Sequence, residues 1–385
     1  MLGKTKWAVP LVVGLLGLTA CASDGAETGA TGGDSGYTQA DEALAAIEGQ
    51  VFSKGPNGEE PADASAAALT DDEVAQVHDL GATAAIVMHY GGNDWANAQI
   101  AGLTERFGEL GIEIVAVTDA DFDPGQQVSD IETVMAKNPD VIVSIPTDPV
   151  ATAAAYKAAA DAGTTLVFMD NVPNGLEAGN DYVSVVSADN YGNGVVSAHL
   201  MSKALQGEGK IGLIYHEADF FVTQQRYDGF KTTIEEQYPN IEIVTEQGIA
   251  GPDFAGDAQN VADAWLTRYP DLDGIWAVWD VPAEGVMAAA RTAGRTDLKI
   301  ATEDLGTNVA IALAKDEMVI GLGAQVPFDQ GITEANLAAG ALLGKTLPPY
   351  VALSALPVTH DNVLDAWRTV YHVDPPKELA DSYKE

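Results

Sequence analysis

Residues 82–117 are ATAAIVMHYGGNDWANAQIAGLTERFGELGIEIVAV, a strand pattern followed by a helix pattern and a second strand pattern. The two apolar runs, 84–88 and 112–117, have the length of buried strands. Between them, apolar side chains recur at helical spacing and form one stripe: Trp95, Ile100, Leu103, Phe107 and Leu110. Two strands joined by a helix pair in parallel, so this stretch predicts a strand-helix-strand unit of a parallel sheet.

The same alternation continues toward residue 325. Further apolar runs of strand length are 141–145, 165–169, 183–187, 210–215, 241–245, 274–279, 298–302 and 319–325. Continuously apolar strands are typical of parallel sheets that helices cover on both faces. These strand-helix units are too many for one compact lobe, and a new strand-helix unit starts at Lys210. We therefore predict an α/β protein with two doubly wound parallel-sheet lobes.

The N-terminus does not follow this pattern. A positively charged start precedes an apolar segment, residues 9–18, which is too short to span a bilayer. The following Leu18-Thr19-Ala20-Cys21 resembles the lipobox of bacterial lipoproteins, and Cys21 is the only cysteine of the chain. We therefore predict a lipoprotein signal peptide at 1–20 and a lipid anchor on Cys21. An ordinary signal peptide with a chance cysteine is the alternative.

Two further segments precede the first strand. Residues 21–37 are rich in Gly, Ser, Thr and acids, which predicts a flexible tether. Residues 38–81 contain helix patterns at 41–47 and 70–80, the second with Thr70 as N-cap. The sequence assigns no role to this N-terminal extension.

The chain is strongly acidic, with 57 Asp and Glu against 19 Lys and Arg and a formal net charge of −38. Nucleic acids and anionic lipid surfaces bind clustered basic residues, so we expect no nucleic-acid partner. The aspartates 119, 121, 123 and 130 have the spacing of a calcium loop, but Pro124 occupies the glycine position. We therefore expect a solvated loop and no metal. We also expect no cofactor.

Polar and aromatic residues follow the predicted strands. They are His89, Tyr90 and Asn93, Thr147 and Asp148, Asp170 and Asn171, then His216, Trp279 and Asp280, and Glu303 and Asp304. In doubly wound sheets, ligands bind at the carboxyl ends of the strands. Carboxylates and amides beside flat rings suit a neutral polyhydroxylated ligand. Arg226, in a chain with few basic residues, offers a fork of donors to such a site.

Each of these residues also has a structural alternative. Asp170 and Asp304 suit the N-caps of helices, and Trp95 and Trp279 suit a core. Arg226 suits a surface ion pair. We expect His89 and His216 to be structural or outer-layer residues rather than catalytic ones, whereas Phe220-Phe221 fits a cleft wall and a lobe surface equally well.

Residues 82 to about 345 resemble the ribose-binding-protein-like family of ABC-transporter solute-binding proteins. The matching motifs, in chain order, are Asn93-Asp94-Trp95, Pro146-Thr147-Asp148, Asp170, Ser187-Ala188-Asp189-Asn190, Arg226-Tyr227-Asp228-Gly229-Phe230, Asp304 and Ala324-Gln325. The resemblance implies the type I periplasmic-binding-protein fold, with two lobes joined by a three-strand hinge. It places an N-terminal lobe at 82–187 plus 304–324 and a C-terminal lobe at 188–303 plus 325–373. The expected crossings are 186–190, 302–305 and 323–326.

The resemblance also implies the site. The positions it assigns to sugar contact are Asn93, Trp95, Asp170, Arg226, Phe254, Asp304 and Gln325. The chain departs from the family at Asn171, where an arginine is common, at Ile145, and at Trp279, where an asparagine is usual. We include Asn171 and Trp279 in the predicted site. These departures remove hydrogen-bonding groups and add aromatic surface, which favours a pentose other than ribose, or a linear polyol.

The implied function is capture of a small carbohydrate by hinge closure and its delivery to an ABC-transporter permease. We expect a monomer, tethered by its lipid to the outer face of the cell membrane, or periplasmic in a cell with two membranes. One alternative is an exported sensory receptor for a sugar. The other is an exported hydrolase with Asp170 and Asp304 as paired carboxylates, but no catalytic motif accompanies them, so we predict that the protein is not an enzyme.

Overall fold

The computed structural model describes residues 33–218 and 220–384. The predicted signal peptide, Cys21 and residues 21–32 of the predicted tether lie outside the described residues. Helix α1 spans Gly33–Ile47, so the last residues of the predicted tether belong to a helix instead. Among the described residues, none of the helices has the length and apolar character needed to cross a membrane.

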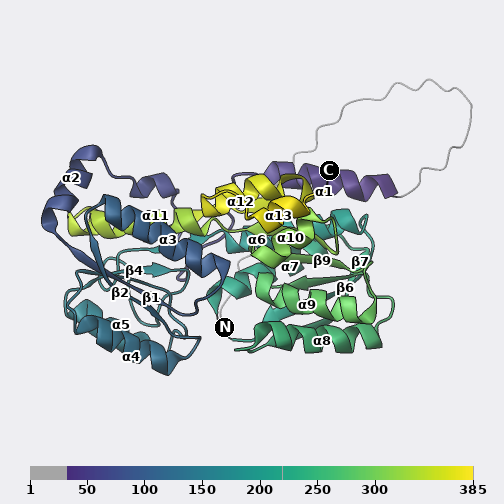
Figure 1. Ribbon diagram of the computed structural model, residues 1–385, viewed down its shortest axis with the longest axis horizontal. Coiled ribbons are helices and arrows are strands. Elements are labelled where there is room, and N and C mark those ends of the chain that lie inside the picture. The colour runs from purple at the N-terminus through teal and green to yellow at the C-terminus, as the bar shows by residue number, and fades with distance from the viewer. Residues whose placement is uncertain (1–32, 219, 385) are drawn as a thin grey trace, which may run out of the picture. The chain divides into compact units, whose positions relative to one another are not determined.

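The first lobe is built on a sheet of order β11-β5-β4-β3-β1-β2, in which the paired strands run parallel. Its strands are β1 Thr83–Met88, β2 Glu113–Asp119, β3 Val141–Ser144, β4 Thr165–Met169, β5 Val185–Ala188 and β11 Tyr350–Leu353. Its helices are α2 Asp71–Leu80, α3 Asp94–Glu109, α4 Pro124–Met135, α5 Ala153–Asp161 and α11 Pro327–Leu342. Buried apolar side chains of α3 and α11 cover one face of this sheet, and those of α4 and α5 cover the other (Figure 1). The burial of β1 and β3 on both faces explains their continuous apolar sequences.

The second lobe repeats this plan with the sheet order β12-β10-β9-β8-β6-β7. Its strands are β6 Gly209–His216, β7 Ile241–Ile249, β8 Gly274–Ala277, β9 Lys299–Glu303, β10 Val319–Ala324 and the antiparallel β12 Leu356–Val358. Its helices are α6 Asn190–Ala204, α7 Phe221–Gln237, α8 Phe254–Arg268, α9 Asp280–Ala293, α10 Thr307–Ala314, α12 Val363–Tyr371 and α13 Lys377–Ser382, with the 3-10 turn η2 His360–Asn362 before α12. Buried side chains of α8, α9 and α10 pack on one face of this sheet, and those of α6 and α7 pack on the other.

The predicted fold class of two parallel-sheet lobes is confirmed, but two lobe assignments are wrong. Residues 304–324 belong to the second lobe, because β10 pairs with β9 and β12. Within 325–373, α11 packs against α3, and β11 pairs with β5, so both lie in the first lobe. Strand order is set by pairing between distant segments, and a strand-helix alternation carries no record of which sheet a strand joins.

The chain crosses between the lobes at three places. They are the step from β5 to α6 at 188–190, the step from β10 to α11 at 324–327, and the step from β11 to β12 at 353–356. The predicted crossings near 186–190 and 323–326 are confirmed. The predicted crossing at 302–305 is wrong, since β9 and α10 both belong to the second lobe. The third crossing follows β11, a four-residue strand that the sequence analysis did not predict.

The N-terminal extension, residues 38–81, contacts both lobes near the places where the chain crosses between them. Helix α1 packs against α6 of the second lobe, and the chain then passes Asp189 at the first crossing. Farther along, Ala62 forms a β-bridge with Val351 of the first lobe. After the 3-10 turn η1, Ala64–Ala67, helix α2 begins at a capping box formed by Thr70, as predicted. The segment to which the sequence assigned no role is therefore part of the folded body.

Asp189 is the residue that joins the extension to the hinge. It is fully buried, and its carboxylate accepts hydrogen bonds from Phe52 N at 2.9 Å, Ser53 N at 2.8 Å and Ser53 Oγ at 2.7 Å. It also caps α6 by accepting from Gly192 N at 2.9 Å. We expect Asp189→Ala to lower the free energy of unfolding by about 2–3 kcal/mol in urea titrations, because several buried donors lose their acceptor.

The matched control is Asp253→Ala, which removes an exposed N-cap that accepts from Gly256 N of α8. A simple cap is worth about 1 kcal/mol. Equal losses in the two variants would show that the contacts of Asp189 with the extension add nothing to stability.

Candidate functional site

A cavity of about 550 Å³, which includes its mouth open to solvent, lies between the carboxyl ends of the two sheets. Its lining residues are His89, Tyr90, Asn93, Trp95, Phe122, Ile145 and Asp170 from the first lobe, His216, Phe220, Val222, Thr223, Arg226, Trp279, Asp280 and Asp304 from the second, and Gln325 at a crossing. Beside it, Asp94 Oδ2 of α3 accepts hydrogen bonds from Thr307 N and Thr307 Oγ1 of α10, both at 2.7 Å. The two lobes are therefore in contact, and the cavity is closed on that side.

Two aspartates occupy equivalent places in the two lobes. Asp170 directly follows β4, and Asp304 directly follows β9, the corresponding strand of the second sheet. Both have left-handed backbones, with φ of 56° and 65°. Residues other than glycine rarely adopt this conformation, and such strain concentrates at functional sites. Neither aspartate caps a helix, because the N-cap of α10 is Gly306 and no helix follows β4.

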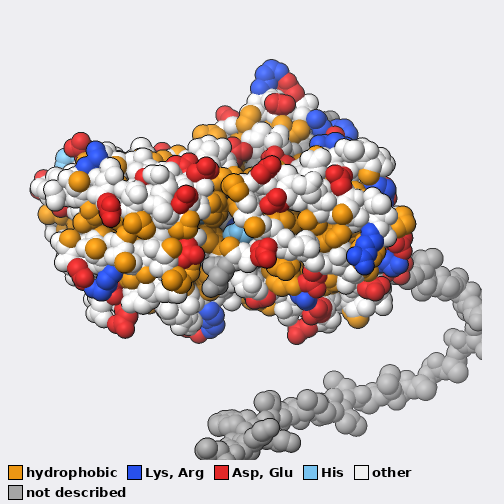
Figure 2. Space-filling model, turned by 90° about the horizontal axis from the view of Figure 1, so that it is seen from below, with side chains coloured by type: hydrophobic (Ala, Val, Ile, Leu, Met, Phe, Trp, Pro, Cys, Tyr) orange, Lys and Arg blue, Asp and Glu red, His pale blue; other side chains and the backbone are white. Residues whose placement is uncertain are grey.

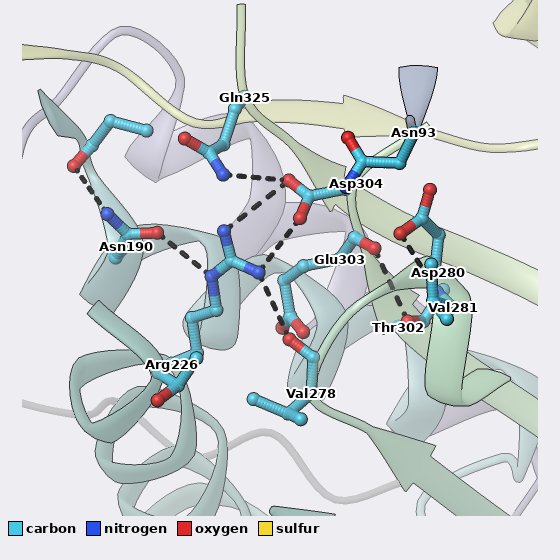
Figure 3. Close-up of polar contacts among 12 residues, drawn as sticks. Asn93, Asn190, Arg226, Val278, Asp280, Val281, Thr302, Glu303, Asp304 and Gln325 are labelled. Carbon is cyan, nitrogen blue, oxygen red and sulfur yellow. Dashed lines mark hydrogen bonds and ion pairs between the residues drawn. The ribbon is translucent and has the colours of Figure 1, made fainter. Parts of the chain in front are cut away.

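Arg226 of α7 connects these carboxylates through buried hydrogen bonds (Figure 3). Its Nη1 donates to Asp304 Oδ2 at 2.9 Å, and its Nε donates to Asn190 Oδ1 at 2.9 Å. Asn190 Nδ2 donates to Ser187 Oγ at 3.0 Å, and Ser187 Oγ donates to Asp170 Oδ1 at 2.6 Å. A continuous polar chain thus runs from Asp170 in one lobe to Asp304 in the other, and it passes through the first crossing. The alternative of a surface ion pair for Arg226 is wrong.

Close packing of α6 on α7 brings Arg226 to this position. A Cβ added to Gly194 of α6 would overlap the backbone oxygen of Arg226, and one added to Gly229 of α7 would overlap the backbone oxygen of Tyr191. Only glycine allows the two backbones to approach so closely. Gln325 completes the arrangement, because its Nε2 donates to Asp304 Oδ1 at 2.9 Å.

Aromatic rings of both lobes meet around the cavity. His89 stacks on Phe220 with ring centroids 5.7 Å apart, and Phe122 lies edge-on to His216 at 6.2 Å. Trp279 contacts His216, with centroids 5.5 Å apart. The first two contacts join rings of the first lobe to rings of the second, whereas Trp279 and His216 both belong to the second lobe. Flat apolar faces beside carboxylates are what the C–H surfaces and hydroxyl groups of a carbohydrate require.

Burial determines the charge of the groups in the cavity. It lowers the pKa of His89 to about 3, with a smaller contribution from His216, and it lowers the pKa of His216 to about 4. Both rings are therefore neutral at neutral pH. Burial raises the pKa of Asp170 to about 6, against the opposing effects of the Ser187 hydrogen bond and of Arg226. Behind Arg226, burial raises the pKa of Glu303 to about 8.

Three polar atoms of lining residues are buried without a hydrogen-bond partner. They are His89 Nδ1, Trp95 Nε1 and Gln325 Oε1. Buried polar atoms are nearly always satisfied in folded proteins, so unsatisfied ones in a cavity wall are candidates for contact with a ligand. Their presence in the same cavity as Asp170 and Asp304 fits a ligand with several hydroxyl groups.

The structure brings together most of the residues that the sequence predicts for the site. Asn93, Trp95, Asp170, Arg226, Trp279, Asp304 and Gln325 line the cavity. Asn93 also caps α3, since its Oδ1 accepts from Ala96 N at 2.7 Å. Phe254 does not line the cavity but packs behind it, with its ring centroid 4.9 Å from that of Trp279. Asn171 faces a separate pocket beside Pro149 and Phe221.

Sequence reasoning omitted several lining residues from the predicted site. Tyr90 and Asp280 directly follow strand ends that were recognised, so their position was a usable signal. Phe122 lies in the acidic loop after β2, which the sequence analysis predicted to be a solvated loop. In that loop, Asp123 caps α4, and Asp119 Oδ1 accepts from Asp121 N.

Comparison with known proteins agrees with this geometry. A family model described as a periplasmic binding protein domain matches residues 84–346, close to the extent of the resemblance found in the sequence. The D-ribose/D-allose-binding protein of Pseudomonas aeruginosa is 29% identical over 227 residues, which cover 58% of this chain and 70% of that protein.

Two ABC-transporter solute-binding proteins of Agrobacterium vitis, each 25% identical, have similar solved structures. The one with bound alpha-D-tagatopyranose has a TM-score of 0.69, with 75% of this chain and 99% of that chain covered. The one with bound allitol has a TM-score of 0.67, with 74% and 98% covered. The chain therefore belongs to the periplasmic binding protein domain family, and its relatives include sugar-binding proteins and ABC-transporter solute-binding proteins.

Proposed function

We propose that this protein is the solute-binding component of an ABC importer, which captures a small carbohydrate between its lobes and delivers it to a permease. A pentose or a sugar alcohol is the favoured ligand. The observation that carries this proposal is the polar chain from Asp170 through Arg226 to Asp304, which lines one cavity with groups of both lobes. A ligand bound there contacts both lobes only when they are closed, and this difference in affinity drives the closure.

We favour this binding role over the alternative of an exported hydrolase. Asp304 is engaged by Arg226 and Gln325, and Asp170 accepts from Ser187, which is the arrangement of a clamp for hydroxyl groups. We propose accordingly that the protein is not an enzyme, and we expect it to act as a monomer without a cofactor. Acidic side chains are spread over the face shown in Figure 2, while basic ones are confined to a few places, which supports the absence of a nucleic-acid partner.

The ligand is identified by a thermal-shift screen of the chain from Ser23 onward, which keeps the compact unit Gly33–Glu385. The panel contains pentoses, hexoses, linear polyols, inositols and nucleosides, and calorimetry follows each hit. A ligand at 100 times its dissociation constant is expected to add about 2.7 kcal/mol of stability. No stabilisation by any of the five classes would contradict the proposed carbohydrate ligand.

We also propose that the protein works outside the cytoplasm, anchored by acyl chains on Cys21 after removal of residues 1–20. The support is the sequence Leu18-Thr19-Ala20-Cys21 together with the family of the folded body. We expect Cys21→Ser to move the protein from the membrane fraction to the soluble fraction and to remove the lipid mass from its N-terminal peptide. An unchanged distribution between the two fractions would contradict the anchor.

A further inference from the structure

The N-terminal extension follows the second lobe first and the first lobe afterwards. Helix α1 packs on α6 of the second lobe, and Lys203 of α6 pairs with Asp41 of α1 at 2.7 Å. Farther along, Ala62 N donates to Tyr350 O of β11 in the first lobe at 3.0 Å, and Ala352 N of the same strand donates to Ala62 O at 3.2 Å. The extension is therefore a further connection between the lobes, beside the three crossings of the chain.

The passage from one lobe to the other falls on two neighbouring residues, Lys54 and Gly55. Gln225 of α7, in the second lobe, donates from its Nε2 to Lys54 O at 3.0 Å. Gly55 lies against the ring of Tyr350 in the first lobe, since a Cβ added to Gly55 would be 3.0 Å from Cγ of that ring. Consecutive residues of the extension are thus held by opposite lobes.

The hydrogen bond of Gln225 lies away from the hinge, whereas that of Ser53 lies on it. Ser53 Oγ donates to Asp189 at the first crossing, where the chain bends, so a rotation of the lobes changes this contact little. Gln225 belongs to α7, which moves with the second lobe. Rotation of α7 relative to β11 must therefore separate Gln225 from Lys54, or it must pull the extension off Tyr350. In either case, opening of the lobes breaks a contact of the extension.

We propose that the extension is a latch across the hinge: the contacts of Lys54 with α7 and of Gly55 with β11 coexist only in the closed form and favour it. This inference rests on the hinge closure of the proposed function and adds a contact outside the cavity that regulates closure. A bond present only in the closed form shifts the equilibrium toward that form and slows release of the ligand. The family model begins at residue 84, so the latch is a property of this chain's own extension.

The test measures the opening of the lobes directly, with and without ligand. The chain from Ser23 onward contains no cysteine, so Val117→Cys and Gln247→Cys introduce the only two sites for spin labels. Both residues are exposed, and they lie on the edge strands β2 and β7, at the ends of the two sheets opposite the strands that carry the crossings. Pulsed electron paramagnetic resonance gives the distribution of label distances, which lengthens when the lobes open.

Variants then assign the closed form to the latch. Gln225→Met keeps the length of the side chain and removes the donor, so the ratio of long to short distances in the ligand-free protein is expected to rise about fivefold. Dissociation of a ligand found in the screen is expected to become faster by a similar factor, and saturating ligand is expected to restore the short distances. Gln224→Met is the matched control, because Gln224 is exposed on the same helix and donates to Asp228 of that helix. It is expected to change neither quantity.

Equal ratios of long to short distances in Gln225→Met and the wild type would overturn the latch and leave the proposed function standing. The same holds if Gln224→Met opens the lobes as far as Gln225→Met does. Label distances that stay unchanged when a ligand detected by calorimetry saturates the wild type would overturn hinge closure, and with it both the proposed function and the inference.

Discussion

Arg226→Met is expected to weaken binding of any carbohydrate found in the screen by at least 100-fold and to lower the free energy of unfolding by about 3–5 kcal/mol. The side chain is 3% exposed, and its guanidinium donates to Asp304, Asn190 and the backbone oxygen of Val278. Methionine fills a similar volume but donates nothing, so it leaves the buried carboxylate of Asp304 without its cation. Calorimetric titration and urea unfolding measure the two effects separately.

Two further variants make this prediction specific. Arg226→Lys keeps the charge but not the fork of donors, and is expected to lie between the wild type and Arg226→Met in both measurements. Arg291→Met removes an exposed arginine that pairs with Glu317 at 3.1 Å, and is expected to change stability by less than about 1 kcal/mol. Unimpaired binding by Arg226→Met would mean that the ligand site lies elsewhere.

Between pH 5 and pH 8, the wild type is expected to lose about 4 kcal/mol more of its free energy of unfolding than Glu303→Gln does. Glu303 is fully buried, and burial raises its pKa from 4.5 in an ordinary setting to about 8. Between these two values the unfolded chain releases the proton of Glu303 and the folded protein keeps it. The stability contributed by this group is therefore complete below pH 4.5 and is lost as the pH rises through about 8.

Urea unfolding at several pH values measures this difference. Glutamine resembles the protonated glutamate, and Glu303 Oε1 accepts hydrogen bonds from Ser197 Oγ and Trp276 Nε1, which an amide oxygen also accepts. The variant and the wild type should thus be similar at pH 5, and the variant should be the more stable at pH 8. Glu105→Gln, on the exposed surface of α3, is the control for a change of net charge. Parallel pH profiles of Glu303→Gln and the wild type would contradict the prediction.

Strands β1 to β10 were predictable because each contains an apolar run. Strand β4 lies at the predicted residues 165–169, and β1 and β9 begin within one residue of their predicted positions. The strands β11 and β12 were not predicted, since both are short and β12 contains Pro357. Their places follow from pairing with β5 and β10, partners more than 30 residues away in the chain, a register that local patterns do not encode.

The residues of the candidate site likewise divide into those that the local sequence indicates and those that only the folded chain brings together. Asp170, Trp279 and Asp304 were found because the residue after a buried parallel strand lies at the ligand-binding edge of the sheet. Phe254 was assigned to the site by family resemblance, and Asn171 by its place after a predicted strand. In the folded chain, Phe254 packs behind the cavity wall and Asn171 faces a second pocket. The pairing of Arg226 with Asp304 depends on the close approach of α6 and α7, which no sequence spacing reports.

By itself, the sequence determined the fold class, the number of lobes and the strand edges where the polar residues gather, because these follow from the period and length of apolar runs. The tertiary structure decided which lobe each C-terminal element joins, how the N-terminal extension meets Asp189, and which carboxylates are paired. Asp280 and Asp304 both follow apolar runs of the sequence, and only the fold pairs Arg226 with Asp304. The physical reason is that charge pairing and burial depend on contacts between segments far apart in the chain, which exist only after the lobes have packed.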